Sequence, residues 1–331
     1  MGSAELIPKR ISAIDWARGV ALVAMAVYHF TWDLTFFGYI DTSVATTGPM
    51  RWFARTIASS FLFLVGISLV LAHGRQIRWP SFGRRLLLVA GCALLISAAT
   101  WLAVRDSFVY FGILHHITVA SVIGLAFIRL DWRLLVPLAL LTFLAGVYLP
   151  SPFFDRPWLL WTGLNTMVRP SNDYVPIFPW FGAVLLGMAF AKSPLIRFAA
   201  NLWNNGSFSG ASKVLIWMGR RSLLVYMVHQ PILIGLVFAA TWVYPPTTID
   251  EFAFPPDSFL DACEQTCLDT SSAEFCISYC ACTDYRLQQQ ELKSDLLSGA
   301  IAVDDPAVVD ITRQCTADIA EALQDFGESN E

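Results

Sequence analysis

Charged side chains are scarce in this chain of 331 residues. Asp, Glu, Lys and Arg together make up 15% of it, whereas soluble proteins carry about 25%. Apolar residues make up 56%, and the mean hydropathy is +0.55. These values exclude a single water-soluble domain as the explanation of the whole chain.

Acidic residues in particular are rare in the first 244 residues. This part holds 8 Asp and Glu against 19 Lys and Arg, a balance of +11. Residues 245–331 hold 18 against 3, a balance of −15, so the net charge of −4 describes neither part. We therefore predict two domains, a basic and apolar one at 1–244 and an acidic one at 245–331.

Several familiar catalytic and phosphate-binding motifs are absent as well. The sequence contains no Gly-rich phosphate loop, no H-E-x-x-H pair and no G-x-S-x-G turn. The usual sequence signals of P-loop nucleotidases, zincin metalloproteases and α/β-hydrolases are therefore missing. We see no internal repeat, and we predict no metal site.

Long apolar stretches fill the basic domain instead. A transmembrane helix needs about 17–25 mostly apolar residues, and seven stretches approach or reach that length. They lie at about 17–37, 56–73, 85–104, 110–128, 134–149, 176–191 and 222–244. We predict an all-α, polytopic membrane bundle of about seven transmembrane helices, followed by a small disulfide-rich helical tail.

The distribution of Lys and Arg between alternate loops predicts the orientation, because cytoplasmic loops of membrane proteins are enriched in both. With the N-terminus inside, 14 of them lie on the inner side. The five on the outer side are Arg51, Arg55, Arg105, Arg156 and Arg169. Seven spans then place residues 245–331 outside. We predict a multi-pass protein of the bacterial cytoplasmic (inner) membrane with a cytoplasmic N-terminus and a periplasmic tail.

Six of the seven cysteines lie in the acidic domain, at Cys263, Cys267, Cys276, Cys280, Cys282 and Cys315. An even set in a small extracytoplasmic segment indicates disulfides. Each C-x3-C pair places both sulfurs on one face of a helix. Six cysteines allow about 15 pairings; our hypothesis is that two such helices pack antiparallel, which would join Cys263 to Cys280 and Cys267 to Cys276 and leave Cys282 for Cys315. A zinc site is the alternative, which the lack of His in the tail disfavours.

The first apolar stretch carries three ionisable side chains, which are costly inside a bilayer and so point to function. Arg18 and His29 lie about 16 Å apart along a helix, and eleven steps of about 100° return His29 to the face of Arg18. Asp33 follows His29 by four residues, on the same face and within reach of the imidazole. One stripe thus holds a cation, an imidazole and a carboxylate.

This stripe suits the relay of an acyl group across the bilayer. In this interpretation Arg18 binds a phosphate, an extended pantetheine arm bridges the gap, and His29 acts as general base, oriented by Asp33. The alternative is structural. Arg18 then snorkels to the inner interface, while His29 and Asp33 form a packed polar pair.

Other polar residues are candidates for binding an acceptor. His115 and His116 stand near the outer end of the fourth stretch, where they line a possible acceptor vestibule. Asn172 and Asp173 precede the sixth stretch and are candidates for holding a polar acceptor, although Asp173 equally suits the cap of the sixth helix. For His229, in the last stretch, we expect a structural hydrogen bond across the bundle.

Two arginine pairs stand at predicted inner helix ends, Arg84-Arg85 and Arg220-Arg221. They are candidates for the phosphates of a cytosolic nucleotide, and the simpler alternative is that they anchor the inner interface. Together with Arg18, we take Arg84, Arg85 and Arg220 as the predicted acyl-CoA-binding residues.

Five segments of the chain together resemble a known family. They read RISAIDWARGVALVAMAVYHFTWDL, SFLFLVGISLVLAHGR, YFGILHHITVAS, SNDYVPIFPWFGAVLLG and GRRSLLVYMVHQPILIG. Over about residues 10–240 the chain is similar to the heparan-alpha-glucosaminide N-acetyltransferase-like family of bacterial membrane proteins. The spacing of Arg18 and His29 also resembles the arginine–histidine signature of family 3 membrane acyltransferases.

This resemblance implies an enzyme that moves an acetyl or other acyl group from cytosolic acyl-CoA to an amine or hydroxyl of an extracytoplasmic glycan. His29 is then the catalytic histidine and Arg18 part of the acyl-CoA site. Acetyl-CoA is expected as a co-substrate, with no permanently bound cofactor. The expected partners are acyl-CoA, a glycan acceptor and the lipid bilayer, without nucleic acid, and a homo-oligomer is left open. The resemblance does not extend to the tail.

Two other functional classes remain open. A transporter or flippase for a glycan or lipid intermediate moves its substrate without CoA chemistry. A non-catalytic scaffold or sensor acts through the disulfide-tied tail, so it needs residues 250–331 but not His29.

Overall fold

The computed structural model describes residues 11–40, 44–45, 47–167, 169–196, 210–246, 259–268, 271–298 and 300–328. The chain forms two compact units, Met1–Pro245 and Pro246–Glu331. The elements within these described ranges are α-helices and short 3-10 turns, and the one β feature there is an isolated bridge between Phe111 and Tyr174. The predicted all-α class is confirmed.

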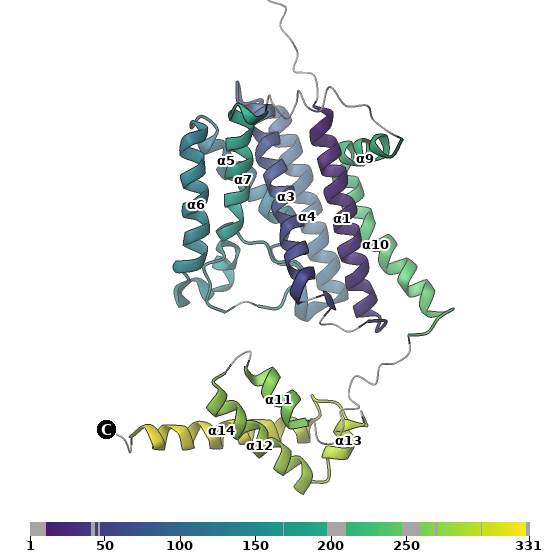
Figure 1. Ribbon diagram of the computed structural model, residues 1–331, viewed down its shortest axis with the longest axis vertical. Coiled ribbons are helices and arrows are strands. Elements are labelled where there is room, and N and C mark those ends of the chain that lie inside the picture. Colours follow the sequence, from purple (N-terminus) through teal and green to yellow (C-terminus); the bar gives the residue numbers. More distant parts are fainter. Residues whose placement is uncertain are drawn as a thin grey trace, which may run out of the picture. The chain divides into compact units, whose positions relative to one another are not determined.

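The first unit is a helical bundle (Figure 1). Its long members are α1 (Ser12–Phe36), α3 (Gly48–His73), α4 (Trp79–Ala103), α5 (Ile113–Phe127), α6 (Trp132–Tyr148), α7 (Ile177–Lys192) and α10 (Ser222–Thr241). A further helix, α9 (Gly210–Arg220), lies across the end of the bundle at which α1 begins. We call this the N-terminal end and the opposite one the far end. Short 3-10 turns follow α4 and α6, namely η1 (Arg105–Ser107), η2 (Pro152–Asp155) and η3 (Pro157–Thr162).

These helices occupy the predicted apolar stretches. Among the described residues, α1, α3, α4 and α10 are long and apolar enough to cross a membrane, and α5, α6 and α7 are shorter apolar helices. Three helices begin earlier than predicted, α1 at Ser12, α3 at Gly48 and α4 at Trp79. The helices α3 and α4 have a proline in the first two positions, where the missing N–H costs nothing. The polar first turns therefore extend each helix beyond its apolar part.

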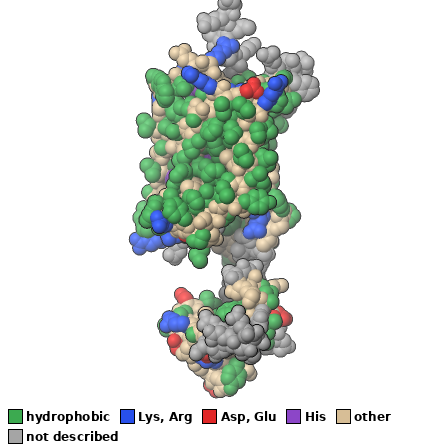
Figure 2. Space-filling view, turned by 90° about the vertical axis from the view of Figure 1, so that its left-hand side faces the viewer, with side chains coloured by type: hydrophobic (Ala, Val, Ile, Leu, Met, Phe, Trp, Pro, Cys, Tyr) green, Lys and Arg blue, Asp and Glu red, His purple; other side chains and the backbone are tan. Residues whose placement is uncertain are grey.

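The outward faces of the bundle are apolar. Leu87, Leu94 and Leu102 of α4 expose 74%, 67% and 85% of their surfaces, and Leu236 of α10 exposes 62%. Figure 2 shows a broad band of hydrophobic side chains with Lys and Arg near both of its ends. So large a continuous apolar surface is unstable in water and fits lipid. The chain is a membrane protein.

Arginines stack on aromatic rings at both ends of the bundle. The guanidinium carbon of Arg105 lies 4.8 Å from the ring centre of Trp101. At the N-terminal end, that of Arg221 lies 5.0 Å from the ring centre of Trp217. Tryptophan and long cations both favour the membrane–water boundary, so these pairs are suited to mark the edges of the apolar band.

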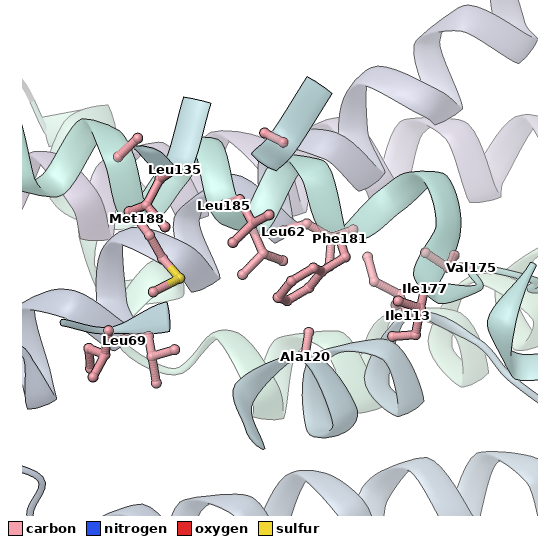
Figure 3. Packing of buried hydrophobic residues seen from close by; sticks show 14 of the residues in the cluster. Leu62, Leu69, Ile113, Ala120, Leu135, Val175, Ile177, Phe181, Leu185 and Met188 are labelled. Carbon is pink, nitrogen blue, oxygen red and sulfur yellow. The ribbon is translucent and has the colours of Figure 1, made fainter. Parts of the chain in front are cut away.

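The interior is packed by side chains from α3, α5, α6 and α7. Leu62 of α3, Leu185 and Met188 of α7 are at most 1% exposed. Figure 3 shows Leu62 beside Leu185 and Phe181, with Ala120 of α5 facing them. This core holds α3 and α5 in fixed positions, and both helices contribute to the cavity described below.

Helix α9 packs closely on α1 because both have glycine at the contact. A Cβ on Gly219 would lie 1.7 Å from the carbonyl oxygen of Asp15, and one on Gly19 would lie 2.1 Å from that of Leu215. Any larger residue at either position forces the backbones apart. The contact brings the end of α9 next to the first turn of α1.

The segment between α6 and α7 folds back onto the bundle. The Tyr174 hydroxyl lies 2.6 Å from the carbonyl oxygen of Leu160 and 2.7 Å from the side-chain oxygen of Asn165. The N–H of Val175 donates to the carbonyl of Phe111, just before α5, at 3.0 Å. These bonds fix the part of the segment that carries two of the predicted acceptor-binding residues.

The second unit contains α11 (Phe259–Leu268), α12 (Ala273–Gln289), α13 (Lys293–Leu297) and α14 (Pro306–Glu328). Disulfides join Cys263 to Cys280, Cys267 to Cys276 and Cys282 to Cys315. The predicted pairing is confirmed. This unit also has its own apolar core around Leu287, Leu296, Val308 and Ile311.

Candidate active site

A buried carboxylate joins two arginines at the N-terminal end of the bundle. Asp15 is 1% exposed, and its Oδ1 accepts a hydrogen bond from Arg18 Nη1 at 3.1 Å. Its Oδ2 lies 3.5 Å from Nε of Arg220, at the end of α9. Arg18 also donates to the hydroxyl of Ser68 on α3. A buried carboxylate needs such partners, so Asp15 holds guanidinium groups from α1 and α9 close together.

A cavity of about 490 Å³ lies beside this cluster, with walls from α1, α3, α4, α5, α9 and α10. Its charged lining consists of Arg18, Arg85, Arg220 and Arg221. The other lining residues are mainly apolar: Phe61, Leu64, Val65, Leu88, Val89, Ile113, Leu114, Ile117, Leu223 and Leu224, with Ser68, Gly219, Ser222 and Tyr226. A cationic part joined to an apolar part is complementary to a ligand with an anionic head and a long uncharged arm.

Three of the four predicted acyl-CoA-binding residues, Arg18, Arg85 and Arg220, line this cavity. Arg84 and Arg85 are both exposed, but Arg84 is not among the lining residues. Neighbours on one helix point about 100° apart, so Arg84 and Arg85 face different surroundings. Arg221 joins the lining because it stands at the break between α9 and α10. Within the described parts of the chain, no three His, Cys, Asp or Glu side chains are placed to hold a metal ion.

Two histidines meet next to the cavity. The ring of His29 on α1 lies 5.1 Å from that of His229 on α10, centre to centre, edge to face. The ring of Tyr226, which lines the cavity, lies 5.6 Å from that of His229. The histidine pair is therefore separated from the cavity by one side chain.

The hydrogen bond of His229 differs from the one we expected. Its Nδ1 donates to the carbonyl of Tyr226, one turn earlier in α10, at 2.6 Å, so it does not reach across the bundle. This bond places the proton on Nδ1 and leaves Nε2 as an acceptor. Nε2 is buried and has no hydrogen-bond partner among the described residues. The sequence interpretation assigned His229 a structural role, and its position beside His29 makes it a candidate functional residue.

Asp33 also has a different partner from the predicted one. It is 2% exposed, and its Oδ1 accepts a hydrogen bond from Nε2 of Gln230 on α10 at 2.6 Å. Among the described contacts it makes no hydrogen bond to His29, which corrects the expected orienting role. Side chains on a helix lean toward its N-terminus, so the ring of His29 is directed back toward Tyr28 and His229. Asp33 therefore accepts its hydrogen bond from Gln230 on α10 instead.

The two histidines of α5 make structural contacts. His116 is fully buried, and its Nδ1 donates to the carbonyls of Val175 and Pro176, each at 3.1 Å. His115 is partly buried and lies 3.2 Å from the Ser97 hydroxyl through its Nε2. Neither lines the cavity. Their predicted part in acceptor binding stays a prediction.

Asp173 caps a helix other than the one we expected. Its Oδ2 accepts a hydrogen bond from the N–H of Ile113 at 2.8 Å, so it caps α5, the fourth predicted span, and not the sixth. Gly112 leaves room for the carboxylate, since a Cβ there would lie 2.3 Å from it. Burial raises the pKa of Asp173 to about 6, against the lowering effect of the Ile113 hydrogen bond. Asn172 is exposed, and its N–H donates to the carbonyl of Ser107 at 2.8 Å.

Ile113 also lines the cavity, so the capped N-terminus of α5 and the histidine pair both adjoin it. The arginines, the cavity, His29 and His229 all lie in the part of the chain up to α10.

Comparison with known proteins assigns the bundle to a family. The family model described as heparan-alpha-glucosaminide N-acetyltransferase, catalytic, matches residues 10–231. No curated protein and no solved structure gives a match. The matched range begins before α1 and ends just beyond His229 and Gln230. On this match, the chain belongs to the family of the heparan-alpha-glucosaminide N-acetyltransferase catalytic domain.

Proposed function

We propose that the protein is a membrane acyltransferase that moves an acetyl or other acyl group from acyl-CoA to an amine or hydroxyl of an extracytoplasmic glycan. Family membership supports the acetyltransferase activity. The observation that carries the finer proposal is the cavity, which joins four arginines to a wall backed by two histidines. The arginines and apolar lining accommodate the donor, and the histidines supply the base.

The arginines bind the phosphates of CoA in this proposal. Guanidinium groups match phosphate oxygens in geometry and charge, and Asp15 keeps Arg18 and Arg220 in place. The uncharged pantetheine arm then lies along the apolar lining toward Tyr226. His29 lies eleven positions after Arg18, about 16 Å further along the helix. With its phosphates at Arg18, the extended arm therefore carries the thioester close to the histidine pair.

His29 acts as general base on the acceptor, or as the acyl carrier. An imidazole takes a proton from a nucleophile as the nucleophile attacks, and returns it to the leaving group. Trapping of a labelled acyl-enzyme distinguishes the two routes, because only the carrier route forms an acyl-histidine.

We place the protein in the bacterial cytoplasmic membrane, with the N-terminal end of the bundle on the cytosolic side and the tail in the periplasm. The excess of Lys and Arg at predicted inner loops supports this orientation, and disulfides in the tail suit an oxidising compartment. The donor then enters from the cytosol, and the acceptor reaches the histidine pair from the other side.

The test compares wild type with His29→Ala in detergent, by acetyl-CoA binding and by CoA release with glucosamine as the acceptor. We expect both proteins to bind acetyl-CoA and only wild type to release CoA. Thr31→Ala, also on α1, is the matched control, since the Thr31 hydroxyl bonds to its own helix, at the carbonyl of Val27. If wild type neither binds nor turns over acetyl-CoA, the proposal fails, and transport without CoA becomes the hypothesis to test.

A further inference from the structure

The cavity beside the arginine cluster is open on one side. Its lining residues on α3 and α5 are buried or partly buried. Five other lining residues are exposed on the surface of the bundle, namely Arg85, Leu88, Arg220, Arg221 and Leu224. They belong to α4 and to the junction of α9 and α10. We call this opening, between α4 and the α9–α10 junction, the mouth of the cavity.

The mouth has the same pattern of side chains on both of its sides. Leu88 follows Arg85 by three residues on α4, and Leu224 follows Arg221 by three residues at the start of α10. Both helices enter the bundle at its N-terminal end, since Arg85 and Arg221 line the same cavity as Arg18. Three residues are about 4.5 Å of helix, so each leucine lies deeper in the bundle than its arginine. The two leucines expose 59% and 58% of their surfaces.

The arginines that line the cavity differ in their partners. Arg18 and Arg220 both pair with the Asp15 carboxylate. Arg85 and Arg221 form no ion pair with any residue that the structure describes. The mouth therefore keeps a positive charge on each of its sides that no carboxylate in the described parts of the chain balances.

The arginines of the mouth suit the depth of lipid phosphates, and its leucines suit the depth of acyl chains. The ring of Trp217 stacks with Arg221, and tryptophan favours the headgroup region of a bilayer. A guanidinium group matches a phosphate in geometry and charge, and basic pockets between membrane helices bind anionic head groups. A free phosphate would leave the leucines without a partner. A zwitterionic lipid would bring a third cation beside two guanidinium groups.

We propose that the mouth binds an anionic phospholipid from the leaflet at the N-terminal end of the bundle. Its phosphate accepts hydrogen bonds from Arg85 and Arg221. One of its acyl chains lies along Leu88 and Leu224 and covers them. This site does not depend on the proposed acyltransferase function, but one consequence rests on it: both arginines also line the proposed donor site, so the lipid and acetyl-CoA compete for them.

The first experiment measures lipid binding by native mass spectrometry of the purified full-length protein in a neutral detergent. The probes are phosphatidylglycerol and phosphatidylcholine with the same acyl chains, and glycerol phosphate, which has the anionic head without chains. We expect phosphatidylglycerol to bind about tenfold more tightly than phosphatidylcholine, the effect of a charge-assisted contact, and glycerol phosphate not to displace it at the same concentration. Equal binding of the two lipids, or displacement by glycerol phosphate, would overturn the lipid site.

Two pairs of variants locate the site. Arg221→Gln should weaken phosphatidylglycerol binding about tenfold, whereas Arg84→Gln, outside the lining, should not. Leu224→Ala should weaken it about three- to tenfold through lost apolar contact, whereas Leu236→Ala, exposed on the same helix but outside the lining, should not. If Arg221→Gln does not fold, Arg85→Gln replaces it on the other side of the mouth. Equal losses in a variant and its control would mean that the lipid binds the whole surface, which contradicts the site.

Competition is measured by acetyl-CoA titration in nanodiscs of phosphatidylcholine alone and of equal parts phosphatidylcholine and phosphatidylglycerol. We expect the affinity for acetyl-CoA to fall several-fold in the anionic nanodiscs, and Leu224→Ala to relieve most of that fall because it weakens lipid binding. A general repulsion of CoA by an anionic surface predicts the same fall in Leu224→Ala, which would contradict competition. If wild type binds no acetyl-CoA in either nanodisc, the acyltransferase proposal fails, while the lipid-binding measurements still decide the site.

Discussion

At the scale of single residues, neighbours in the sequence have different roles. Arg84 and Arg85 are chemically identical, yet only Arg85 lines the cavity. His115 and His116 are likewise adjacent, and only His116 is fully buried. Residue type therefore narrows the candidates, and the direction of each side chain decides among them.

Arg85→Ala should weaken acetyl-CoA binding about tenfold or more, because it removes a charged donor from the cavity wall. Arg84→Ala is the matched control and should have little effect, since Arg84 is outside the cavity lining. Titration calorimetry with acetyl-CoA measures both. Equal losses in the two variants would mean that the effect is one of overall positive charge and not of the cavity.

Asp173→Asn should change the pH dependence of stability. Because the pKa of Asp173 is raised to about 6 in the folded protein, its contribution to stability is full below about pH 4 and is lost as the pH rises through 6. The ionised wild-type residue then opposes folding by about 2 kcal/mol at pH 8, allowing for partial exposure. Asparagine stays neutral and keeps an acceptor for the Ile113 N–H.

The measurement is the Tm of wild type and Asp173→Asn from pH 4 to 8. We expect the variant to gain on wild type as the pH rises through 6. Two parallel curves would show that Asp173 is no less acidic in the folded protein than in the unfolded chain.

At the scale of elements, the contact between α9 and α1 assembles the arginine cluster. Gly19 and Gly219 let the two backbones touch, and this contact brings Arg220 to Asp15. Without it, Arg220 would belong to a surface helix far from Arg18. The proposed acyl-CoA site thus depends on a helix–helix contact as much as on its cations.

Gly219→Ala should destabilise the protein by about 1–3 kcal/mol, as overpacked contacts do, and should weaken acetyl-CoA binding by displacing Arg220. Gly235→Ala is the control. A Cβ at Gly235 meets nothing within 4 Å, and alanine favours a helix over glycine by about 1 kcal/mol. Thermal shift and acetyl-CoA titration together test this. Wild-type affinity in Gly219→Ala would contradict the role of the contact.

At the scale of the whole molecule, the two units have separate cores and different means of stabilisation. The bundle has an apolar surface suited to lipid, while the tail is small, acidic and tied by three disulfides. A small domain with little core commonly depends on such crosslinks.

Reduction of the full-length protein should therefore unfold the tail and leave acetyl-CoA binding intact. The disulfides close loops with sequence separations of 17, 9 and 33 residues, and each typically contributes about 2–4 kcal/mol. Circular dichroism with and without reductant follows the loss of helix, and acetyl-CoA titration follows the bundle. Loss of acetyl-CoA binding on reduction would contradict the expectation that the bundle binds its ligand independently of the tail.

The sequence by itself determined the all-α class, the approximate helix positions and the family, and it suggested the disulfide pairing that the structure then showed. Hydropathy and cysteine spacing are local properties, and a helix in lipid must satisfy its backbone within itself, so these features are readable along the chain. The starts of helices were harder to predict, because α3 and α4 begin with polar turns that precede their apolar parts.

Only the tertiary structure decided which side chains meet. Asp33 accepts a hydrogen bond from Gln230, and the ring of His29 contacts that of His229. Asp173 caps α5, and Arg85 lines the cavity whereas Arg84 does not. Each of these contacts joins residues on different helices or loops. They depend on how far each helix is rotated and shifted against its neighbours, and the close packing of side chains between helices sets that rotation. The spacing of residues within a single helix carries no information about it.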